Sequence, residues 1–495
     1  MRLGCESDFR LNLVDAFPGS RHNLGMFRTV EVPLWALLLL VGFAAVTFAS
    51  HFLFPSVRWF FRRWAERLVA RLNARLVQPI EPFKLAHRMD TVNRVIHDPD
   101  VARAILDHAR EKGLPEQVAF ETARRYAREI VPGFSALLYF GVATRLAQWL
   151  SRSLYRIRVS GEAEAMEGID PQATIVFVLN HRSNMDYVLV TWLVARRAAL
   201  AYAVGEWARR WPLGSLIRAM GGYFVRRRDL NPLYRKVLAR YVQIATQNGV
   251  TQAIFPEGRL SRDGSLHAPK LGLLSYIIAD HAAGATRDVV LVPVAVNYER
   301  VLEDRGLIAA QAGAVNPFRL RWWMVARYLG RHLQLRVTGR FTRFGYAAVA
   351  FGRPLSLHRF LRSGHDDPAA DLGAALMRRI EEVLPVLPMA LVCEALVGGA
   401  RDVATIAERL SKRTTALRAA GHIVHAEARD ARQATTVALR MLEVRNIVTL
   451  HEDRISVTSE LEPILGFYAR TLPRGRGGAA SDGGFTEDTY GSISS

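Results

Sequence analysis

The chain has 495 residues, and 66 lysine and arginine residues against 46 aspartate and glutamate residues give it a formal net charge of +20. Hydrophobic residues make up 50% of it, which excludes a largely disordered polybasic chain. Two cysteines, Cys5 and Cys393, exclude a disulfide scaffold and a zinc site built on thiolates. A folded protein with this charge is expected to meet an anionic partner, namely nucleic acid, acidic lipid or phosphate.

The first expected element is an apolar segment at residues 32–57, which reads VPLWALLLLVGFAAVTFASHFLFPSV and contains no Asp, Glu, Lys or Arg. At 1.5 Å per residue it extends roughly 39 Å as a helix, enough to cross a hydrocarbon core of about 30 Å. About 30 residues precede it and it is longer than the apolar region of a signal peptide, so we predict a transmembrane helix rather than a cleaved leader. A buried helix, or a hairpin broken at Pro55 that dips into the membrane, is the alternative.

Arginines are far more frequent after this segment than before it. Those that follow are Arg58, Arg62, Arg63, Arg67, Arg71 and Arg75, and those that precede it at similar range are Arg21 and Arg28. The positive-inside rule therefore places the bulk of the chain on the cytoplasmic face of the cell membrane. Residues 58–84 begin with RWFFRRWAERLVARLNARL, which predicts a basic amphipathic segment lying on anionic phospholipid.

The rest of the chain divides by pattern. After an N-terminal segment (1–31), the transmembrane helix and the interfacial segment, we expect a helical region at 85–155, an α/β domain at 156–362, a mainly helical module at 372–472 and a disordered tail at 473–495. The α/β assignment depends on short apolar runs between helical stretches, which are TIVFVLN, TQAIFP, VVLVPVAVNY, LQLRVTGRF and AVAFGRPL. In the C-terminal module, NIVTL and RISVT predict a hairpin.

The first block with chemical content is NHRSNMD at residues 180–186, directly after an apolar run. His181 lies five residues before Asp186, a spacing that suits a general base and the carboxylate that orients it. The carboxylate would fix the tautomer, and the other ring nitrogen would take a proton from a substrate hydroxyl. Taken alone the pattern is also compatible with a histidine at a strand end and an aspartate that caps a helix.

Three further blocks follow. GGYFVRRR at 221–228 presents arginines whose planar guanidinium groups suit phosphate. FPEGRLSRDG at 255–264 combines glycine turns, a hydroxyl and arginines, which favour an anion site, and PKLG at 269–272 adds a lysine. VPVAVNYE at 292–299 reads as a buried strand that ends in polar residues. Each block by itself is weakly specific.

In their order and spacing, the four blocks resemble those of the glycerol-3-phosphate acyltransferase family of bacterial membrane-bound type. That family belongs to a superfamily that includes lysophosphatidate and dihydroxyacetone-phosphate acyltransferases. The resemblance covers roughly residues 75–472 and includes REKGLPEQVAFETARRYAREIVPGFS, VAFGRPLSL and ELEPILGFYARTL. It implies a mixed sheet flanked by helices, with an N-terminal transmembrane and helical region and a C-terminal mainly helical module.

The resemblance also implies a reaction and roles for the matching residues. The chain would transfer a fatty acyl group from acyl-CoA or acyl carrier protein to the sn-1 hydroxyl of glycerol 3-phosphate, giving lysophosphatidate, with no metal and no further cofactor. His181 would be the general base and Asp186 would polarise it. The acceptor phosphate would bind Arg226, Arg227, Ser261, Arg262 and Lys270. The surrounding pocket would be formed by Phe224, Glu257, Gly258, Arg259 and Pro293.

The chain departs from the family pattern at two places. Arg259 and Leu260 occupy positions where bacterial members usually have glycine and then arginine, and Asn184 replaces a common second histidine. Acylation of lysophosphatidate, dihydroxyacetone phosphate or another lipid is therefore the closest alternative. A membrane adaptor that has lost catalysis is a different class, and the intact His181 and Asp186 pair argues against it. Nucleic acid is not expected as a partner, because the basic aromatic cluster adjoins an apolar span.

Overall fold

The computed structural model describes residue 33, residues 35–42, scattered positions between 63 and 76, and most of residues 80–473. Within that last range it leaves out residues 86–87, 196, 206–208, 210–212, 227–229, 283–285, 314–329, 331–333, 335–337, 339–342 and 427–429. The chain divides into two compact units, Met1–Ala74 and Arg75–Ser495. The predictions for residues 1–31 and for the tail beyond Pro473 lie outside the described residues.

In the first unit, residues 35–42 are helical. Their large apolar side chains are exposed, and Leu38, Leu39 and Leu40 have exposed fractions of 64%, 65% and 68%. Most of the predicted transmembrane segment lies outside the described residues. Within the part of the chain that is described, no helix has both the length and the apolar content needed to cross a membrane.

The second unit begins with a helical region. Its elements are α2 (Pro82–Leu85), α3 (Arg88–Ile96), α4 (Pro99–Lys112), α5 (Glu116–Ile130), the π-helix η1 (Leu137–Ala143) and α6 (Thr144–Leu154). The helical pattern around residues 101–131 forms two helices, because Gly113 takes a left-handed conformation at φ 60° and Pro115 follows it. The side chain of Asp98 caps α4 by accepting from the backbone N–H of Asp100 at 3.0 Å.

An eight-stranded mixed sheet forms the centre of the second unit. The strands are β1 (Arg156–Ser160), β2 (Thr174–Leu179), β3 (Ala201–Gly205), β4 (Gly222–Val225), β5 (Gln252–Ile254), β6 (Val289–Tyr298), β7 (Tyr346–Phe351) and β8 (Leu355–Ser356). Their order is β1-β7-β6-β2-β5-β3-β4, and β8 pairs with β6. The strands from β6 to β4 in this order are parallel to one another, whereas β7 and β8 run antiparallel to β6. The predicted α/β class with a mixed sheet flanked by helices is confirmed.

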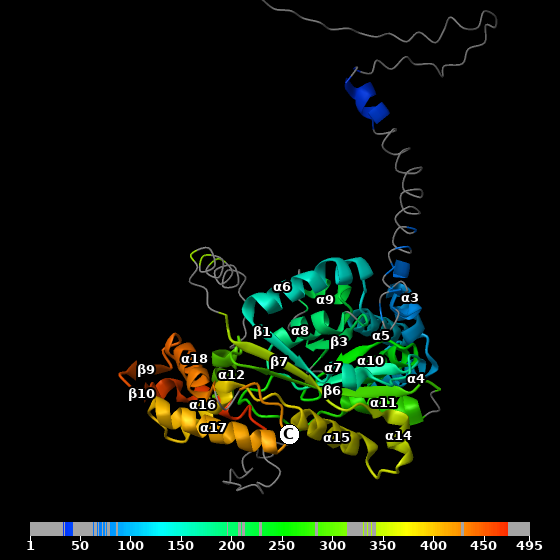
Figure 1. Ribbon diagram of the computed structural model, residues 1–495. Coiled ribbons are helices and arrows are strands. Elements are labelled where there is room, and N and C mark those ends of the chain that lie inside the picture. The colour runs from blue at the N-terminus through cyan, green and yellow to red at the C-terminus, as the bar shows by residue number, and fades with distance from the viewer. Residues whose placement is uncertain are drawn as a thin grey trace, which may run out of the picture. The chain divides into compact units, whose positions relative to one another are not determined.

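Helices cover both faces of this sheet, as Figure 1 shows. The connecting helices are α7 (Glu162–Met166), α8 (Met185–Val194), α9 (Leu213–Ala219), α10 (Pro232–Gln247), α11 (Gly272–Ala282), α12 (Asp304–Gln311) and α14 (Leu357–Arg362). On one face α6 packs against α8, and on the other α10 packs against α4, α5 and α11. Both central strands β2 and β6 are buried along their whole length, which is why they read as continuous apolar runs.

The structure corrects part of the strand prediction. The run LQLRVTGRF does not form a strand where it is described, because Gln334 is helical and its carbonyl accepts from the N–H of Thr338 at 2.9 Å. Three strands were not expected from the sequence. β1 is an edge strand with exposed polar positions, and β3 and β4 are short and contain glycine, so none of them shows a clear apolar alternation.

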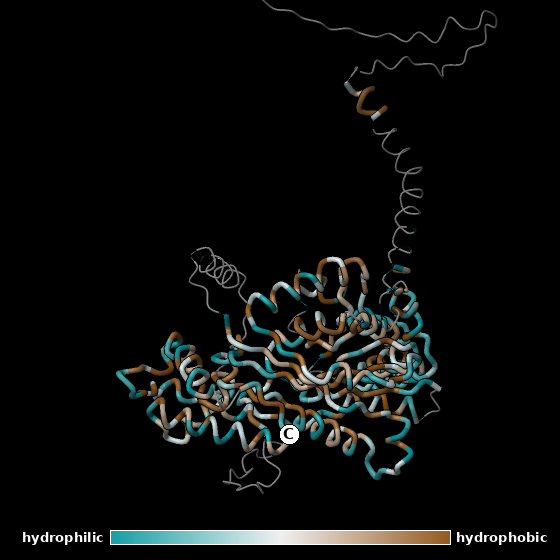
Figure 2. The backbone as a smooth tube through the Cα atoms, in the orientation of Figure 1, coloured by the Kyte–Doolittle hydropathy of each residue, from teal (hydrophilic) through white to brown (hydrophobic). Residues whose placement is uncertain are grey.

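The C-terminal module consists of α15 (Pro368–Glu382), α16 (Pro388–Val397), α17 (Val403–Ala419), α18 (Ala431–Glu443), β9 (Val448–His451), β10 (Arg454–Val457), the 3₁₀ turn η4 (Ser459–Leu461) and α19 (Glu462–Ala469). The predicted hairpin is present, since β9 and β10 pair antiparallel with His451 opposite Arg454. Figure 2 shows the tip of this hairpin as hydrophilic, whereas the segment of η1 and α6 carries hydrophobic stretches.

Candidate functional site

The first block lies in the loop between β2 and α8, where it brings a histidine and an aspartate together. His181 Nδ1 is 2.9 Å from Asp186 Oδ2, and both side chains are buried. The ring of His181 lies against Phe255, with 4.2 Å between ring centroids. No described residue is a hydrogen-bond partner for His181 Nε2. The arrangement orients the ring through Nδ1 and leaves Nε2 free to exchange a proton with a ligand.

Asp186 is the acceptor for a set of converging donors. Its Oδ2 also accepts from the backbone N–H groups of Arg182 at 2.8 Å and Ser183 at 3.0 Å. Its Oδ1 accepts from the hydroxyl of Tyr298 at 2.7 Å, at the end of β6. Burial and the Asp186 charge raise the pKa of Tyr298 well above its usual value, so the phenol stays protonated and donates. Asp186 is thereby fixed in position independently of His181.

Two further carboxylates hold the same loop. Glu257 Oε1 accepts from the backbone N–H of His181 at 2.9 Å, and its Oε2 accepts from the N–H of His267 at 3.1 Å. Glu303 Oε2 accepts from the Ser183 hydroxyl at 2.7 Å, and its Oε1 accepts from the side-chain amide of Asn184 at 3.0 Å. Burial raises the pKa of both glutamates, and these donors act against that shift.

The third block folds over the first. Its Ser261 donates its backbone N–H to the His181 carbonyl at 2.9 Å, while its hydroxyl donates to the Ser265 carbonyl at 2.8 Å. Arg262 Nη1 donates to the Ala310 carbonyl at 3.3 Å on α12. Gly258 has φ 68°, and a Cβ there would lie 2.8 Å from Lys270 Cδ, so the lysine stem covers this glycine. Arg259 and Lys270 are exposed.

The second block ends β4, three strands from β2 in the sheet. Phe224 is buried in β4. Arg226 forms a bidentate pair with the buried carboxylate of Glu129, with its Nε and Nη2 2.9 and 2.7 Å from the two oxygens. Hydrogen bonding to Glu129 raises the pKa of Arg226. Arg227 lies outside the described residues, so of the two predicted phosphate ligands one is held by Glu129 and the other is not placed.

Pro293 lies within β6, opposite Val178 of β2. Proline has no backbone N–H and is rare inside a sheet. On the other side of β6, the antiparallel partner changes here from β8, which pairs with Val290 and Leu291, to β7, which pairs from Val294 onward. The missing donor therefore falls at a break between partners, and the Pro293 carbonyl accepts from Gly352 N–H at 2.8 Å.

Sequence reasoning missed four residues that shape this site, namely Glu129, Arg182, Tyr298 and Glu303. Arg182 is 1% exposed, and its Nη1 donates to the carbonyls of Gly264 and Ser265, which ties the first block to the third. Burial lowers its pKa, opposed by the charges of Glu257, Asp186 and Asp263. Tyr298 and Arg182 lie inside blocks that the sequence singled out, and Glu129 lies in the stretch at 110–135 that carries part of the resemblance. Glu303 lies in none of these segments.

One cluster in the described part of the chain has the composition of a cation site. Ligand atoms of His281, Asp288 and His358 lie within 4.8 Å of one another, at the start of β6. His181 follows the end of β2, which is parallel to β6. The cluster therefore lies at the opposite edge of the sheet from His181, and it contains none of the predicted site residues.

Comparison with known protein families identifies two matching segments. Residues 156–297 match the family model described as Acyltransferase. Residues 332–469 match the model described as Glycerol-3-phosphate acyltransferase C-terminal region. The first segment contains the loop of His181 and Asp186, and the second contains most of the C-terminal module.

Two similar proteins have the name glycerol-3-phosphate acyltransferase. The glycerol-3-phosphate acyltransferase of Pseudomonas putida KT2440 is 28% identical over 361 residues, covering 68% of this chain and 42% of that protein. The protein of the same name from Shewanella amazonensis is 31% identical over 281 residues, covering 56% of this chain and 34% of that protein. The chain thus spans less than half the length of these relatives. A crystal structure of the 1-acyl-sn-glycerophosphate (LPA) acyltransferase from Thermotoga maritima matches 49% of this chain and 77% of that chain, with 21% identity and a TM-score of 0.31.

Proposed function

This chain is related to the glycerol-3-phosphate acyltransferases and carries both an acyltransferase domain and their C-terminal region, and from this premise we propose its reaction. It transfers a fatty acyl group from an acyl thioester to the sn-1 hydroxyl of glycerol 3-phosphate. The product is lysophosphatidate, the first intermediate of phospholipid synthesis. The donor is acyl-CoA or acyl carrier protein, and no metal or additional cofactor takes part.

In the proposed mechanism His181 Nε2 removes the proton of the acceptor hydroxyl as its oxygen attacks the thioester carbon. The tetrahedral intermediate collapses with cleavage of the carbon–sulfur bond, and the imidazolium returns its proton to the leaving thiolate. Asp186 holds the tautomer that leaves Nε2 unprotonated, and stabilises the imidazolium. The supporting observation is the 2.9 Å contact between His181 Nδ1 and Asp186, with Nε2 free of described partners.

The acceptor phosphate is proposed to bind among Arg226, Arg262, Ser261 and Lys270, with Arg227 as a further ligand. These residues follow the carboxyl ends of β4 and β5, at the same edge of the sheet as His181, where ligands of parallel sheets usually bind. Arg226 must then exchange at least part of its pairing with Glu129 for the phosphate. Arg259 is exposed in the same loop and can offer a guanidinium group from one position earlier than in relatives of usual pattern.

An acyl-transfer assay on membranes from cells that express the full chain tests this function. Glycerol 3-phosphate, dihydroxyacetone phosphate and lysophosphatidate are supplied separately, each with a long-chain acyl-CoA or acyl carrier protein. We expect glycerol 3-phosphate to be acylated, and the His181→Ala variant to lose about 10²–10⁴-fold in kcat. His451→Ala changes an exposed histidine of β9 and serves as the matched control. Wild-type turnover in His181→Ala would exclude the proposed base, and acylation of lysophosphatidate alone would exclude the proposed acceptor.

We propose that the protein works at the cytoplasmic face of the cell membrane, anchored by residues 32–57 and by the basic segment that follows. The exposed leucines of residues 35–42 support this, because no described residue covers them. A second support is the helical segment of η1 and α6, whose outer side exposes Leu137, Val142 and Leu146. Such a stripe suits contact with the boundary between lipid head groups and acyl chains.

Removal of residues 1–57 tests the anchoring. We expect this variant to remain on membranes at low salt and to be released by high salt or alkaline carbonate, whereas the full chain resists both. Release of the truncated chain even at low salt would exclude an interfacial role for residues 58–84 and for the η1–α6 stripe. Full release of the intact chain by carbonate would exclude the transmembrane anchor.

A further inference from the structure

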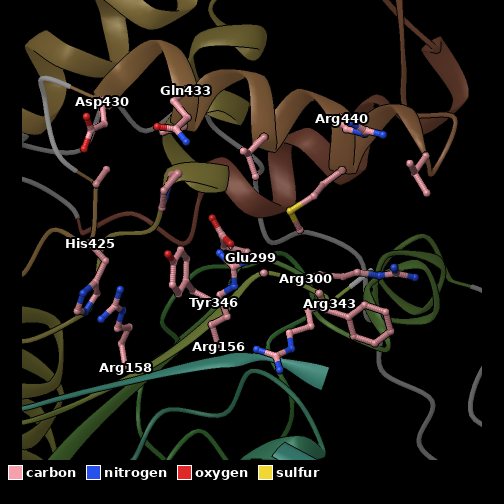
Figure 3. Close-up of a pocket in the computed structure, with 18 residues that line it drawn as sticks. Arg156, Arg158, Glu299, Arg300, Arg343, Tyr346, His425, Asp430, Gln433 and Arg440 are labelled. Atoms are coloured by element: carbon pink, nitrogen blue, oxygen red, sulfur yellow. Dashed lines mark hydrogen bonds between the residues drawn. The ribbon is translucent and has the colours of Figure 1, made fainter. Parts of the chain in front are cut away.

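A cavity of about 800 Å³ lies between the β1–β7 edge of the sheet and helix α18 of the C-terminal module. Figure 3 shows Arg156 and Arg158 on the strand that forms one wall, with Gln433 and Arg440 on the helix opposite and Asp430 directly before that helix. None of the residues assigned to the proposed reaction lines this cavity. Its volume is in the range of sites that take small organic ligands.

The cavity is basic, because five arginines line it against two carboxyl groups. Arg156, Arg158, Arg343 and Arg440 are exposed, and none of the four forms an ion pair with a described carboxylate. The two carboxylates that line the cavity are Glu299 and Asp430.

Glu299 contributes one carboxyl group to the cavity wall, and the charge of Arg156 acts on it. It is buried, and its Oε2 accepts from the Tyr346 N–H at 2.8 Å. By contrast, Arg226 of the proposed phosphate site pairs with Glu129, and Arg445 pairs with Asp304 of α12. Guanidinium groups without carboxylates favour a ligand that carries phosphate.

The helix wall of the same cavity is apolar. Ala434, Val437, Met441 and Val444 line it, at spacings of three and four residues that place them on one side of α18 and its C-terminal turn. Val437 and Val444 have exposed fractions of 53% and 67%. A purely ionic ligand would leave this surface in water. A ligand with an alkyl chain would cover it.

The cavity and the His181–Asp186 pair lie on opposite sides of the end of β6. Tyr298 ends β6 and donates to Asp186, whereas the next residue, Glu299, lines the cavity. Glu299 still donates its N–H to the Tyr346 carbonyl of β7, so the two side chains alternate as in a strand. His181 contacts Asp186 through Nδ1, so its Nε2 points away from the carboxylate that also binds Tyr298. A ligand in the cavity is therefore separated from the atom that would exchange the proton.

We propose that this cavity binds a phosphate-bearing lipid, with the phosphate on the arginines of β1 and α18 and the acyl chain along the apolar side of α18. The site is distinct from the acceptor site, and its existence does not depend on the proposed reaction. Two sources share this chemistry: a lysophosphatidate molecule that enters from water, and a diacyl phosphatidate that enters from the bilayer.

Hydrogen exchange on the full chain in phosphatidylcholine nanodiscs tests the proposal. The probes are lysophosphatidate added from water, phosphatidate incorporated into the nanodisc, monoacylglycerol as the chain without phosphate, and glycerol 3-phosphate as the phosphate without chain. We expect exchange in residues 431–443 to slow with lysophosphatidate, with phosphatidate, or with both, which identifies the source. Monoacylglycerol and glycerol 3-phosphate are expected to leave it unchanged.

Variants locate the binding. Arg158→Gln combined with Arg440→Gln is expected to weaken lipid binding about tenfold or more, since it removes two charge-assisted contacts. Val437→Ser tests the apolar wall separately and is expected to weaken binding of the chain-bearing ligands. Arg378→Gln, an exposed arginine of α15 outside the cavity, is the matched control and should bind as the wild type does. All these positions are exposed, so the fold should tolerate the changes. Three results would overturn the proposal. They are unchanged protection in the double arginine variant, equal protection by monoacylglycerol or glycerol 3-phosphate, and a lack of protection with lysophosphatidate as well as with phosphatidate.

Discussion

At the scale of single residues, three carboxylates determine the geometry of the candidate site, and of these Asp186 and Glu257 are buried and Glu303 is half-buried. Asp186 accepts from one side-chain nitrogen, two backbone N–H groups and the Tyr298 hydroxyl, so its position does not depend on a ligand. Glu257 and Glu303 bind N–H and hydroxyl groups of the same loop. Removing a carboxylate from water costs free energy unless the carboxylate is hydrogen-bonded. Each of these three accepts hydrogen bonds from donors of a loop that belongs to no strand or helix.

Arg226 is the residue at which the structure most sharpens the sequence prediction. Arg226→Gln should raise the KM for glycerol 3-phosphate about tenfold or more, because a charge-assisted contact with the phosphate is lost, while kcat changes less. The buried Glu129 keeps its contact with Arg209 at 2.6 Å, so the fold should be retained. Steady-state kinetics with varied acceptor measure this effect. An unchanged KM in a folded variant would assign Arg226 to structure alone.

Glu299 predicts a specific pH dependence of stability. Burial raises the pKa of Glu299 to about 7, opposed by the N–H groups of Tyr346 and Met389 and by the charge of Arg156. The folded protein therefore binds more protons than the unfolded chain between about pH 4.5 and 7, and this residue makes the free energy of unfolding fall as pH rises through that window. Its contribution is at most about 3 kcal/mol.

Glu299→Gln should remove that contribution. Denaturant unfolding at pH 5 and at pH 8 measures it, and the wild type should lose more stability between the two values than the variant does. Glu460→Gln changes an exposed glutamate and serves as the control, with the pH dependence of the wild type. Equal pH dependence in Glu299→Gln and wild type would contradict the expectation.

At the scale of elements, the site is assembled from loops that follow parallel strands. The loop after β2 carries the histidine, the loop after β5 carries Glu257 and Ser261, and the end of β6 carries Tyr298. Because these strands are parallel, their carboxyl ends meet at one edge, which concentrates the blocks there although 112 residues separate Asp186 from Tyr298. Pro293 is accommodated because it falls at the break between β7 and β8.

The loop after β2 should lose its order when Glu303 is removed. Glu303→Ala leaves the Ser183 hydroxyl and the Asn184 amide without their acceptor, so we expect kcat to fall about tenfold with a small change in KM. Hydrogen exchange in residues 182–186 should become faster. Glu162→Ala on α7 removes a carboxylate paired with Arg197 and is the matched control. Wild-type exchange and kcat in Glu303→Ala would show that the other carboxylates suffice.

At the scale of the second unit, the C-terminal module is joined to the α/β domain by buried polar contacts. The Tyr468 hydroxyl of α19 donates to Asp304 Oδ2 at 2.6 Å and accepts from the Val301 N–H at 3.0 Å. Arg445 binds the same carboxylate at 2.5 Å. Gly264, at φ 90°, lies so close to the Phe467 carbonyl that a Cβ would be 1.9 Å from it. The module thus packs directly on the third block rather than forming a separate appendage.

Tyr468→Phe should destabilise this junction by about 1–3 kcal/mol, because Asp304 and the Val301 N–H each lose a partner in a buried site. Thermal unfolding should show a lower midpoint and earlier loss of activity. Tyr223→Phe is the matched control, since the Tyr223 hydroxyl is buried without a hydrogen-bond partner among the described residues and its removal should cost nothing. Equal unfolding midpoints for Tyr468→Phe and wild type would show that the junction depends on apolar packing alone.

The net charge of +20 is distributed among several roles at this scale. Some arginines are paired with buried carboxylates, as Arg226 is with Glu129 and Arg445 with Asp304. Others line the cavity between β1 and α18, where Arg156 and Arg158 lie over the ring of Tyr346. The arginines after residue 57 remain a prediction about the membrane, because most of that segment lies outside the described residues.

The sequence by itself determined the α/β class, the order of the blocks and the histidine–aspartate pair, because each depends on local spacing or on an apolar strand directly before a polar loop. Only the tertiary structure decided which groups surround that pair. Glu129 reaches Arg226 across 97 residues, and Glu303 reaches Ser183 across 120. The periodicity of apolar residues indicates which face of a single helix or strand is buried. These contacts, and the cavity against α18, arise instead from the packing of elements that are distant in the sequence.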